Sequence, residues 1–203
     1  MEKPASNTYP IHPLLKRRWS PRAFSDRPVE KEKLQSLFEA ARWSASSSNE
    51  QPWHFMMGLK GDPTWTAIFE TLDEGNREWA GNVPMLLLAI CRNFYLRHKR
   101  PNSYAAYDTG QAVSQLAIEA TDLGLFVHQM GGFDPEKARL LFEIPEGYRP
   151  LTAIAIGYPG NPDMLPARQK ERESAERKRR DPGEFVHTEK FGKSSGLFDR
   201  KIT

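Results

Sequence analysis

Apolar residues recur at helical spacing in four segments of the chain. In residues 28–44, four of them lie at positions i, i+3, i+4 and i+7: Leu34, Leu37, Phe38 and Ala41. Charged residues precede this set, so the pattern predicts an amphipathic helix with one buried face. Further helices are predicted over residues 64–72, 104–123 and 135–142.

A continuous apolar run at residues 84–91 predicts a central strand that is covered on both faces. Shorter apolar segments predict three further strands, at residues 53–59, 125–129 and 151–158. Strands that alternate with helices along the chain indicate a layered domain of the α+β or α/β class.

The two ends of the chain lack such a pattern. Residues 1–13 are polar, contain three prolines and predict an irregular arm. After Gly160 the chain is charged and has few aliphatic residues for about forty positions, too little apolar surface for an independent domain. This extension must pack on something else, and a second subunit is one candidate.

Composition narrows the class of protein. With 203 residues, 38% hydrophobic residues and a mean hydropathy of −0.66, the chain suits a soluble globular protein with a substantial core. The longest apolar run has eight residues, too few to span a bilayer, and the N-terminus lacks the apolar core of a secretory signal. The single cysteine, Cys91, excludes an intramolecular disulfide and is expected to be a buried, inert side chain. We therefore expect a cytoplasmic protein.

Positive charge is concentrated near the C-terminus. The net charge is only +3, but seven of the thirteen residues from Arg168 to Arg180 are lysine or arginine. One interpretation is a solvated charged helix with i,i+4 ion pairs, and another is a segment whose end binds phosphate. Nucleic-acid binding is less favoured, because Glu171, Glu173 and Glu176 would repel a phosphate backbone.

Familiar catalytic and metal-binding motifs are missing from the sequence. The five histidines show no HxxxH or HExxH spacing, and no GxSxG, GxGxxG or P-loop motif is present. We expect no metal site and assign no catalytic side chain.

Three polar segments suit an anionic, flat, hydroxyl-bearing ligand. Arg18, Ser20 and Arg22 alternate, so an extended backbone would project them to one side, although the segment could also be a basic surface loop. The segment at residues 46–53 groups hydroxyl and amide side chains ahead of a strand, and it could equally be a helix cap with its loop. The paired glycines in residues 128–134 would let backbone N–H groups approach a ligand, or they could form a simple turn before a helix.

Taken in order, the Arg-x-Ser-x-Arg segment, Ser-Ser-x-Asn-x-Gln-Pro-Trp, Gly-Gly-Phe-Asp and the late basic Arg-Lys-Arg-Arg resemble the nitroreductase family of FMN-dependent oxidoreductases. The resemblance implies a homodimer of a three-layer α+β fold, whose mostly antiparallel sheet is flanked by helices. It also implies an N-terminal arm at 1–13, an FMN-binding domain at 14–160 and an extension at 161–203 that wraps the partner subunit across the dimer.

Site residues follow from the same resemblance. Arg18 and Ser20, with Trp19 between them, match the segment that holds the FMN phosphate and ribityl chain, and Arg22 matches a cation near N1 and O2 of the flavin ring. The remaining matched residues are Ser46 and Ser47, which reach the other subunit's flavin, Asn49 and Gln51 in the same motif, Gly131 and Gly132 near flavin N5, and Lys178 and Arg180 at the phosphate. Asn76 is a further candidate for the pyrimidine edge of the ring.

The implied activity is hydride transfer from NADH or NADPH through FMN to a small acceptor such as a nitroaromatic or a quinone, by a ping-pong mechanism. Reductive dehalogenation, enone reduction or flavin fragmentation on the same fold stays open. A basic nucleic-acid-binding module is a more distant alternative. No membrane or nucleic-acid partner is expected.

Overall fold

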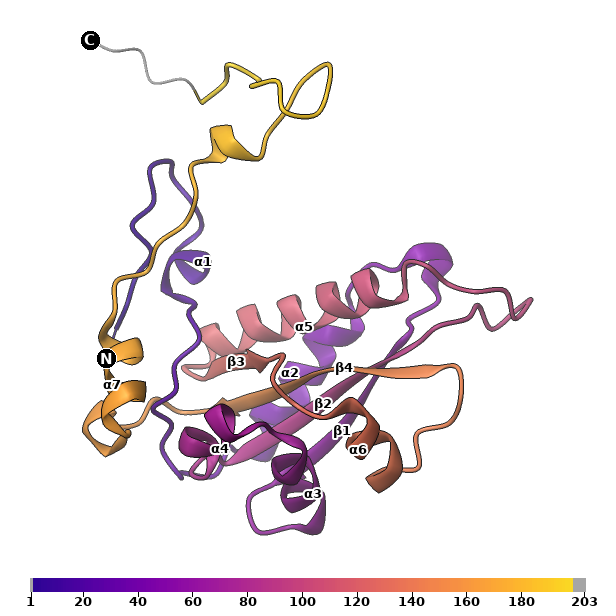
Figure 1. Cartoon of the computed structure of the whole chain (residues 1–203), viewed down its shortest axis with the longest axis vertical. Coiled ribbons are helices and arrows are strands. Elements are labelled where there is room, and N and C mark those ends of the chain that lie inside the picture. Colours follow the sequence, from indigo (N-terminus) through magenta and orange to yellow (C-terminus); the bar gives the residue numbers. More distant parts are fainter. Residues whose placement is uncertain (1, 199–203) are drawn as a thin grey trace.

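A four-stranded antiparallel sheet lies at the centre of the computed structural model, which describes residues 2–198. The strands are ordered β1-β2-β4-β3 (Figure 1), so β2 and β4 lie inside and β1 and β3 at the edges. Their bounds are β1 (Trp53–Leu59), β2 (Met85–Arg92), β3 (Phe126–Met130) and β4 (Tyr148–Gly157). The mostly antiparallel sheet of the predicted α+β fold is confirmed.

Helices cover both faces of the sheet. They are α1 (Pro13–Arg17), α2 (Lys31–Arg42), α3 (Pro63–Thr71), α4 (Glu74–Ala80), α5 (Ala105–Asp122), α6 (Pro135–Leu141) and α7 (Ala167–Ser174), and short 3-10 turns occur at η1 (Ser47–Asn49), η2 (Pro162–Met164) and η3 (Pro182–Glu184).

Strand β2 shows why the fold has three layers. Every residue of β2 is buried, and successive side chains enter different cores. Leu86 and Leu88 pack with α3, α4 and α6, whereas Met85 and Leu87 pack with α2 and α5. The predicted central strand is therefore confirmed, and its continuous apolar run reflects burial on both faces.

Most predicted elements are present with ends shifted by a few residues. The start of β4 is shifted by three residues: the strand begins at Tyr148 rather than near residue 151, and it includes Pro150. Pro150 lies opposite Ile90, at an irregularity in the pairing with β2, where a residue without an N–H can be accommodated. The short helix α4 was not predicted, because it buries only Trp79 and Ala80 and shows no apolar repeat.

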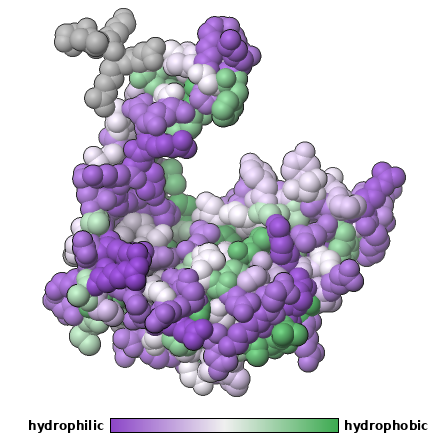
Figure 2. All heavy atoms as spheres, viewed as in Figure 1, coloured by the Kyte–Doolittle hydropathy of each residue, from purple (hydrophilic) through white to green (hydrophobic). Residues whose placement is uncertain are grey.

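The extension begins against the body of the chain and then runs away from it. Helix α7 is attached to the body through buried Gln169 and Glu173. Beyond α7 the chain runs beside the N-terminal arm and away from the sheet (Figure 1), and hydrophilic atoms gather over both segments (Figure 2). The side chain of Lys3 donates to the Glu173 carbonyl, which joins the arm to α7, and Arg177 beyond α7 donates to the Lys3 carbonyl. Among residues 2–198, no helix combines the length and apolarity needed to cross a bilayer.

Candidate cofactor site

The Arg-x-Ser-x-Arg segment forms one wall of a hollow. Helix α1 ends at Arg17, and the chain then extends to an antiparallel bridge between Phe24 and Pro159. Trp19 turns inward and packs edge-on against Phe126, with ring centroids 6.1 Å apart. The residues around this anchor, Arg18, Ser20 and Arg22, line a hollow of about 250 Å³ together with Lys178.

Positive charge dominates this hollow. Lys3, Arg172, Arg177 and Arg179 also line it, whereas Glu176 is the acidic residue in its wall. Burial lowers the pKa of the Arg18 guanidinium, and the nearby charge of Arg179 lowers it further. Cations held this close together attract an anion, and planar guanidinium groups match the oxygens of a phosphate.

The basic residues of the extension divide into two roles. The guanidinium of Arg177 donates to the carbonyl oxygens of Lys3, Lys16 and Arg18, at 2.6, 3.2 and 2.9 Å. Arg177 therefore holds the arm and the extension together. Arg180, by contrast, lines a neighbouring hollow of about 610 Å³ and lies 5.9 Å from the Phe185 ring. Of the predicted basic pair, Lys178 alone lines the hollow of Arg18.

Trp19, which also lines the hollow, has a buried polar atom without a hydrogen-bond partner in residues 2–198. Its side chain is 6% exposed, and the indole Nε1 is a buried donor without a hydrogen-bond partner among the described residues. A buried donor is normally satisfied, so this indole N–H is an unmet hydrogen-bonding group beside the hollow.

The glycine pair lies close to the same segment. His128 in β3 shares a 2.7 Å hydrogen bond between its Nδ1 and the Pro21 carbonyl, and Gly131 follows three residues later, about 10 Å along an extended chain. The Gly132 carbonyl accepts from Asn76 Nδ2 at 2.9 Å. A Cβ at Gly132 would lie 2.0 Å from Asp73 Oδ2, so the Asp73 side chain would have to move to admit one, whereas the space beside Gly131 is open. Asn76 therefore belongs to this group.

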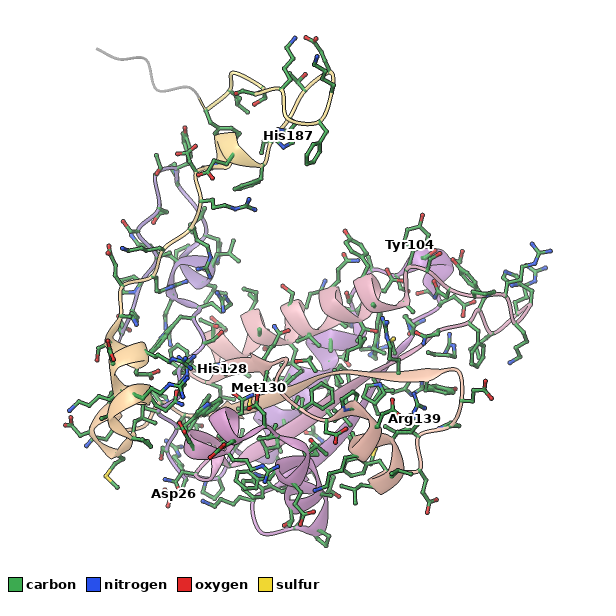
Figure 3. The ribbon with its side chains drawn as sticks, viewed as in Figure 1. Asp26, Tyr104, His128, Met130, Arg139 and His187 are labelled. Atoms are coloured by element: carbon green, nitrogen blue, oxygen red, sulfur yellow. The ribbon has the colours of Figure 1, made fainter. Side chains whose placement is uncertain are left out.

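The segment at residues 46–51 lies at the other end of the molecule. The Ser47 N–H donates to Asp108, in the first turn of α5, whereas Trp19 packs on Phe126 just beyond the end of α5. The eighteen residues of α5 span roughly 27 Å. In Figure 3, Tyr104 marks the first end and His128 the second. Within one chain, Ser46 and Ser47 therefore lie far from the hollow that Arg18 lines.

The backbone of this segment is strained. The backbone φ angles of Ser48, Asn49 and Gln51 are 53°, 54° and 47°. Residues other than glycine rarely adopt this left-handed conformation. Strain of this kind is concentrated at functional sites. The predicted residues Ser46 and Ser47 directly precede the first strained position, and the predicted residues Asn49 and Gln51 are themselves strained.

The structure adds residues that the sequence patterns did not indicate. Lys3 and Arg172 line the hollow, and the buried Glu173 accepts hydrogen bonds from the segment that forms one of its walls. No sequence pattern could indicate these residues. Lys3 belongs to an irregular arm without a repeat, and Glu173 is one of several acidic residues within a highly charged helix.

Comparison with known proteins now decides the family. The nitroreductase family matches residues 15–62 and 59–158 of the chain. The chain belongs to the nitroreductase family. The resemblance inferred from the motif order is thereby confirmed, and the chain is an oxidoreductase of this family.

Individual relatives agree with this assignment. An uncharacterized 15.4 kDa protein of Mycolicibacterium smegmatis is 32% identical over 146 residues, which cover 68% of this chain and 97% of that protein. A protein predicted to be an NADH dehydrogenase/NAD(P)H nitroreductase, from Streptomyces coelicolor, is 26% identical and covers 71% of this chain and 82% of its own length. The crystal structure of an oxidoreductase containing FMN is 35% identical, with a TM-score of 0.88 over 93% of this chain and 96% of that one.

Proposed function

We propose that this nitroreductase-family chain binds FMN, with the phosphate held by Arg18, Ser20 and Lys178 in the hollow and with Arg22, in the wall of the same hollow, toward the flavin ring. The observation that carries the proposal is the excess of cations around a hydroxyl group in a hollow of about 250 Å³. Trp19, in the same wall, has a buried indole N–H without a partner among the described residues. The FMN of the related crystal structure supports this choice of cofactor.

Bound FMN supplies the chemistry, because its ring accepts a hydride from NADH or NADPH and passes electrons to an acceptor. The chain's own residues bind and polarise it. Arg22 places a cation that stabilises negative charge on the reduced ring, and Gly131 leaves open space through which a backbone N–H can reach a ligand. A nitroaromatic or a quinone would then follow the nicotinamide in the same place, which is a ping-pong order.

A complete site requires two copies of the chain. The serine segment lies about one α5 length, roughly 27 Å, from the Arg18 hollow. In a homodimer, Ser46, Ser47, Asn49 and Gln51 of one copy would complete the site of the other. Within this arrangement residues 14–160 form the FMN-binding domain, and the part of the extension beyond α7 reaches the partner subunit.

The first experiment is purification and spectroscopy. The protein should be yellow, with the absorbance of bound flavin, and should oxidise NADH or NADPH when a nitrofuran or a quinone is added. Initial rates at several acceptor concentrations should give parallel reciprocal plots, as a ping-pong order requires. A colourless protein that takes up no added FMN would refute the proposal, and turnover with only a halogenated phenol would redirect it to dehalogenation.

A further inference from the structure

Glu173 is a buried carboxylate within a helix whose other residues, apart from Gln169, are exposed. It lies on α7, is 1% exposed, and shares a buried face with Gln169, four residues earlier. Its Oε2 accepts from the Arg22 N–H at 2.8 Å, and its Oε1 accepts from the Ala23 N–H at 3.2 Å. Both oxygens therefore hold consecutive amides of the segment that lines the hollow.

A carboxylate is costly to bury unless hydrogen bonds or nearby charges replace its water. Glu173 forms no ion pair within 4.0 Å in residues 2–198, so the two backbone amides are the contacts that fix it. The charges of Lys3 and Arg22 are close enough to interact with it, and its negative charge opposes the lowering of the Arg22 pKa that burial causes. Charge-assisted bonds to a backbone N–H are stronger than neutral ones, so this contact restrains the backbone at Arg22.

We propose that Glu173 is a positioning residue for the cofactor site: its carboxylate holds the Arg22–Ala23 backbone so that the Arg22 guanidinium faces the hollow. The inference rests on the proposed binding of FMN. It also explains why part of the charged extension packs on its own subunit, since α7 carries the carboxylate to a segment that precedes it by 151 residues.

Glu173 could act by holding the Arg22 backbone in place or only through its negative charge. These two roles predict opposite effects on FMN binding, so two substitutions distinguish them. Glu173→Asp keeps the charge but shortens the side chain, and Glu173→Gln keeps the length but removes the charge and one acceptor. If the carboxylate positions the Arg22 backbone, both variants weaken FMN binding, on the order of tenfold. If Glu173 acts only through its charge, the aspartate variant binds like the wild type and the glutamine variant binds the phosphate more tightly.

Two matched controls accompany these variants. Glu171→Gln removes an exposed carboxylate of α7 that does not line the hollow and should leave FMN binding unchanged. Gln169→Ala loosens α7 at its contact with the Gly75 carbonyl and leaves the Arg22 segment untouched. A loss in Gln169→Ala equal to that in Glu173→Asp would reduce Glu173 to a helix anchor and overturn the proposal.

The measurements are FMN titration of the apoprotein by flavin fluorescence, the midpoint potential of the bound flavin, and hydrogen exchange at the Arg22 and Ala23 amides. Displacement of Arg22 should make the potential more negative in Glu173→Asp. Faster amide exchange in the folded apoprotein reports the contact without any cofactor. Unchanged exchange in both Glu173 variants would overturn the proposal, whereas a wild type that binds no FMN refutes the proposed function alone.

Discussion

Single side chains around the hollow differ sharply in environment, and His128 is the clearest case. Its ring lies 4.7 Å from the Trp79 ring between centroids, and its Nδ1 is 2.7 Å from the Pro21 carbonyl. Since a carbonyl only accepts, Nδ1 carries the proton and donates. Burial lowers the pKa of His128 to about 4, the bond to Pro21 raises it somewhat, and the charge of Arg22 lowers it. His128 is therefore neutral at neutral pH.

This pKa predicts that acid weakens the fold. The unfolded chain binds a proton on His128 near pH 6.5, whereas the folded chain does so only near pH 4, so stability falls as the pH falls through that window. Between pH 7 and pH 5 the loss from this group should be about 2 kcal/mol. Thermal unfolding across this range should show a smaller decrease in Tm for His128→Gln than for the wild type.

The carboxylates provide the control for that experiment. Hydrogen bonds lower the pKa of Glu30 to about 2, the largest from Tyr158, and those from Arg42 and Trp43 lower that of Glu39 to about 2. Their effect on stability is confined to pH values below about 4.5, where these groups take up protons. A wild-type Tm that stays level from pH 7 to pH 5 would contradict the assignment of His128 as a buried neutral ring.

At the scale of elements, α3 sits unusually close to β1. A Cβ at Gly58 in β1 would lie 2.2 Å from the backbone nitrogen of Trp65 in α3, and backbone cannot swing aside as a flexible side chain can. Glycine at this position therefore sets the spacing between the helix and the sheet.

Gly58→Ala should destabilise the protein by about 1–3 kcal/mol, because α3 must shift to make room. The measurement is urea unfolding followed by circular dichroism. Gly81→Ala is the matched control, since a Cβ there meets nothing within 4 Å and the residue already has a right-handed helical backbone. Equal stability of the two variants would show that α3 packs less closely on β1.

The extension allows a second prediction at this scale. Lys178→Ala should weaken FMN binding on the order of tenfold and leave Tm unchanged, because its side chain lines the hollow from an exposed position. Arg177→Ala should instead lower stability by about 2 kcal/mol, because the carbonyl oxygens of Lys3 and Arg18 lose the Arg177 donor, while that of Lys16 keeps only the Ala5 N–H. Arg180→Ala, in the neighbouring hollow, serves as the control. Flavin retention after ultrafiltration measures the loss of FMN binding, and thermal unfolding measures the loss of stability. Tight FMN binding by Lys178→Ala would show that Arg18 and Ser20 bind the phosphate without Lys178.

At the scale of the whole molecule, the separation of the two predicted halves of the site leads to a test of the dimer. The wild type should sediment as a dimer, at about twice the 23.2 kDa chain mass. Arg18→Ala and the double variant Ser46→Ala/Ser47→Ala should each bind FMN weakly, because each spoils one half of every site.

Mixing the two variants should restore binding. A mixed dimer carries one doubly altered site and one unaltered site, so random exchange should restore about one site in four. Flavin fluorescence after unfolding and refolding the mixture measures this recovery. Tight FMN binding by a monomer, or no recovery in mixed dimers of demonstrated composition, would contradict a shared site.

Local patterns determined most of the architecture. The alternating faces of β2 and the helical spacing of Leu34 and Leu37 encode burial within a few residues, because a side chain's face follows directly from the backbone period. The order of the motifs likewise determined the family, since each motif is a short contiguous segment. Neither inference required contacts between distant parts of the chain.

Tertiary structure alone decided how the site is assembled. Glu173 meets Arg22 across 151 residues, Asn76 meets Gly132 across 56, and no local spacing signals either contact. The tertiary structure also gave different roles to neighbouring residues of the basic segment at 177–180. Arg177 turns toward three backbone carbonyls, while Lys178 lines the hollow. Sequence periodicity reports which face of an element is buried. Which distant element covers that face depends on packing in three dimensions, and so does the direction of each long charged side chain.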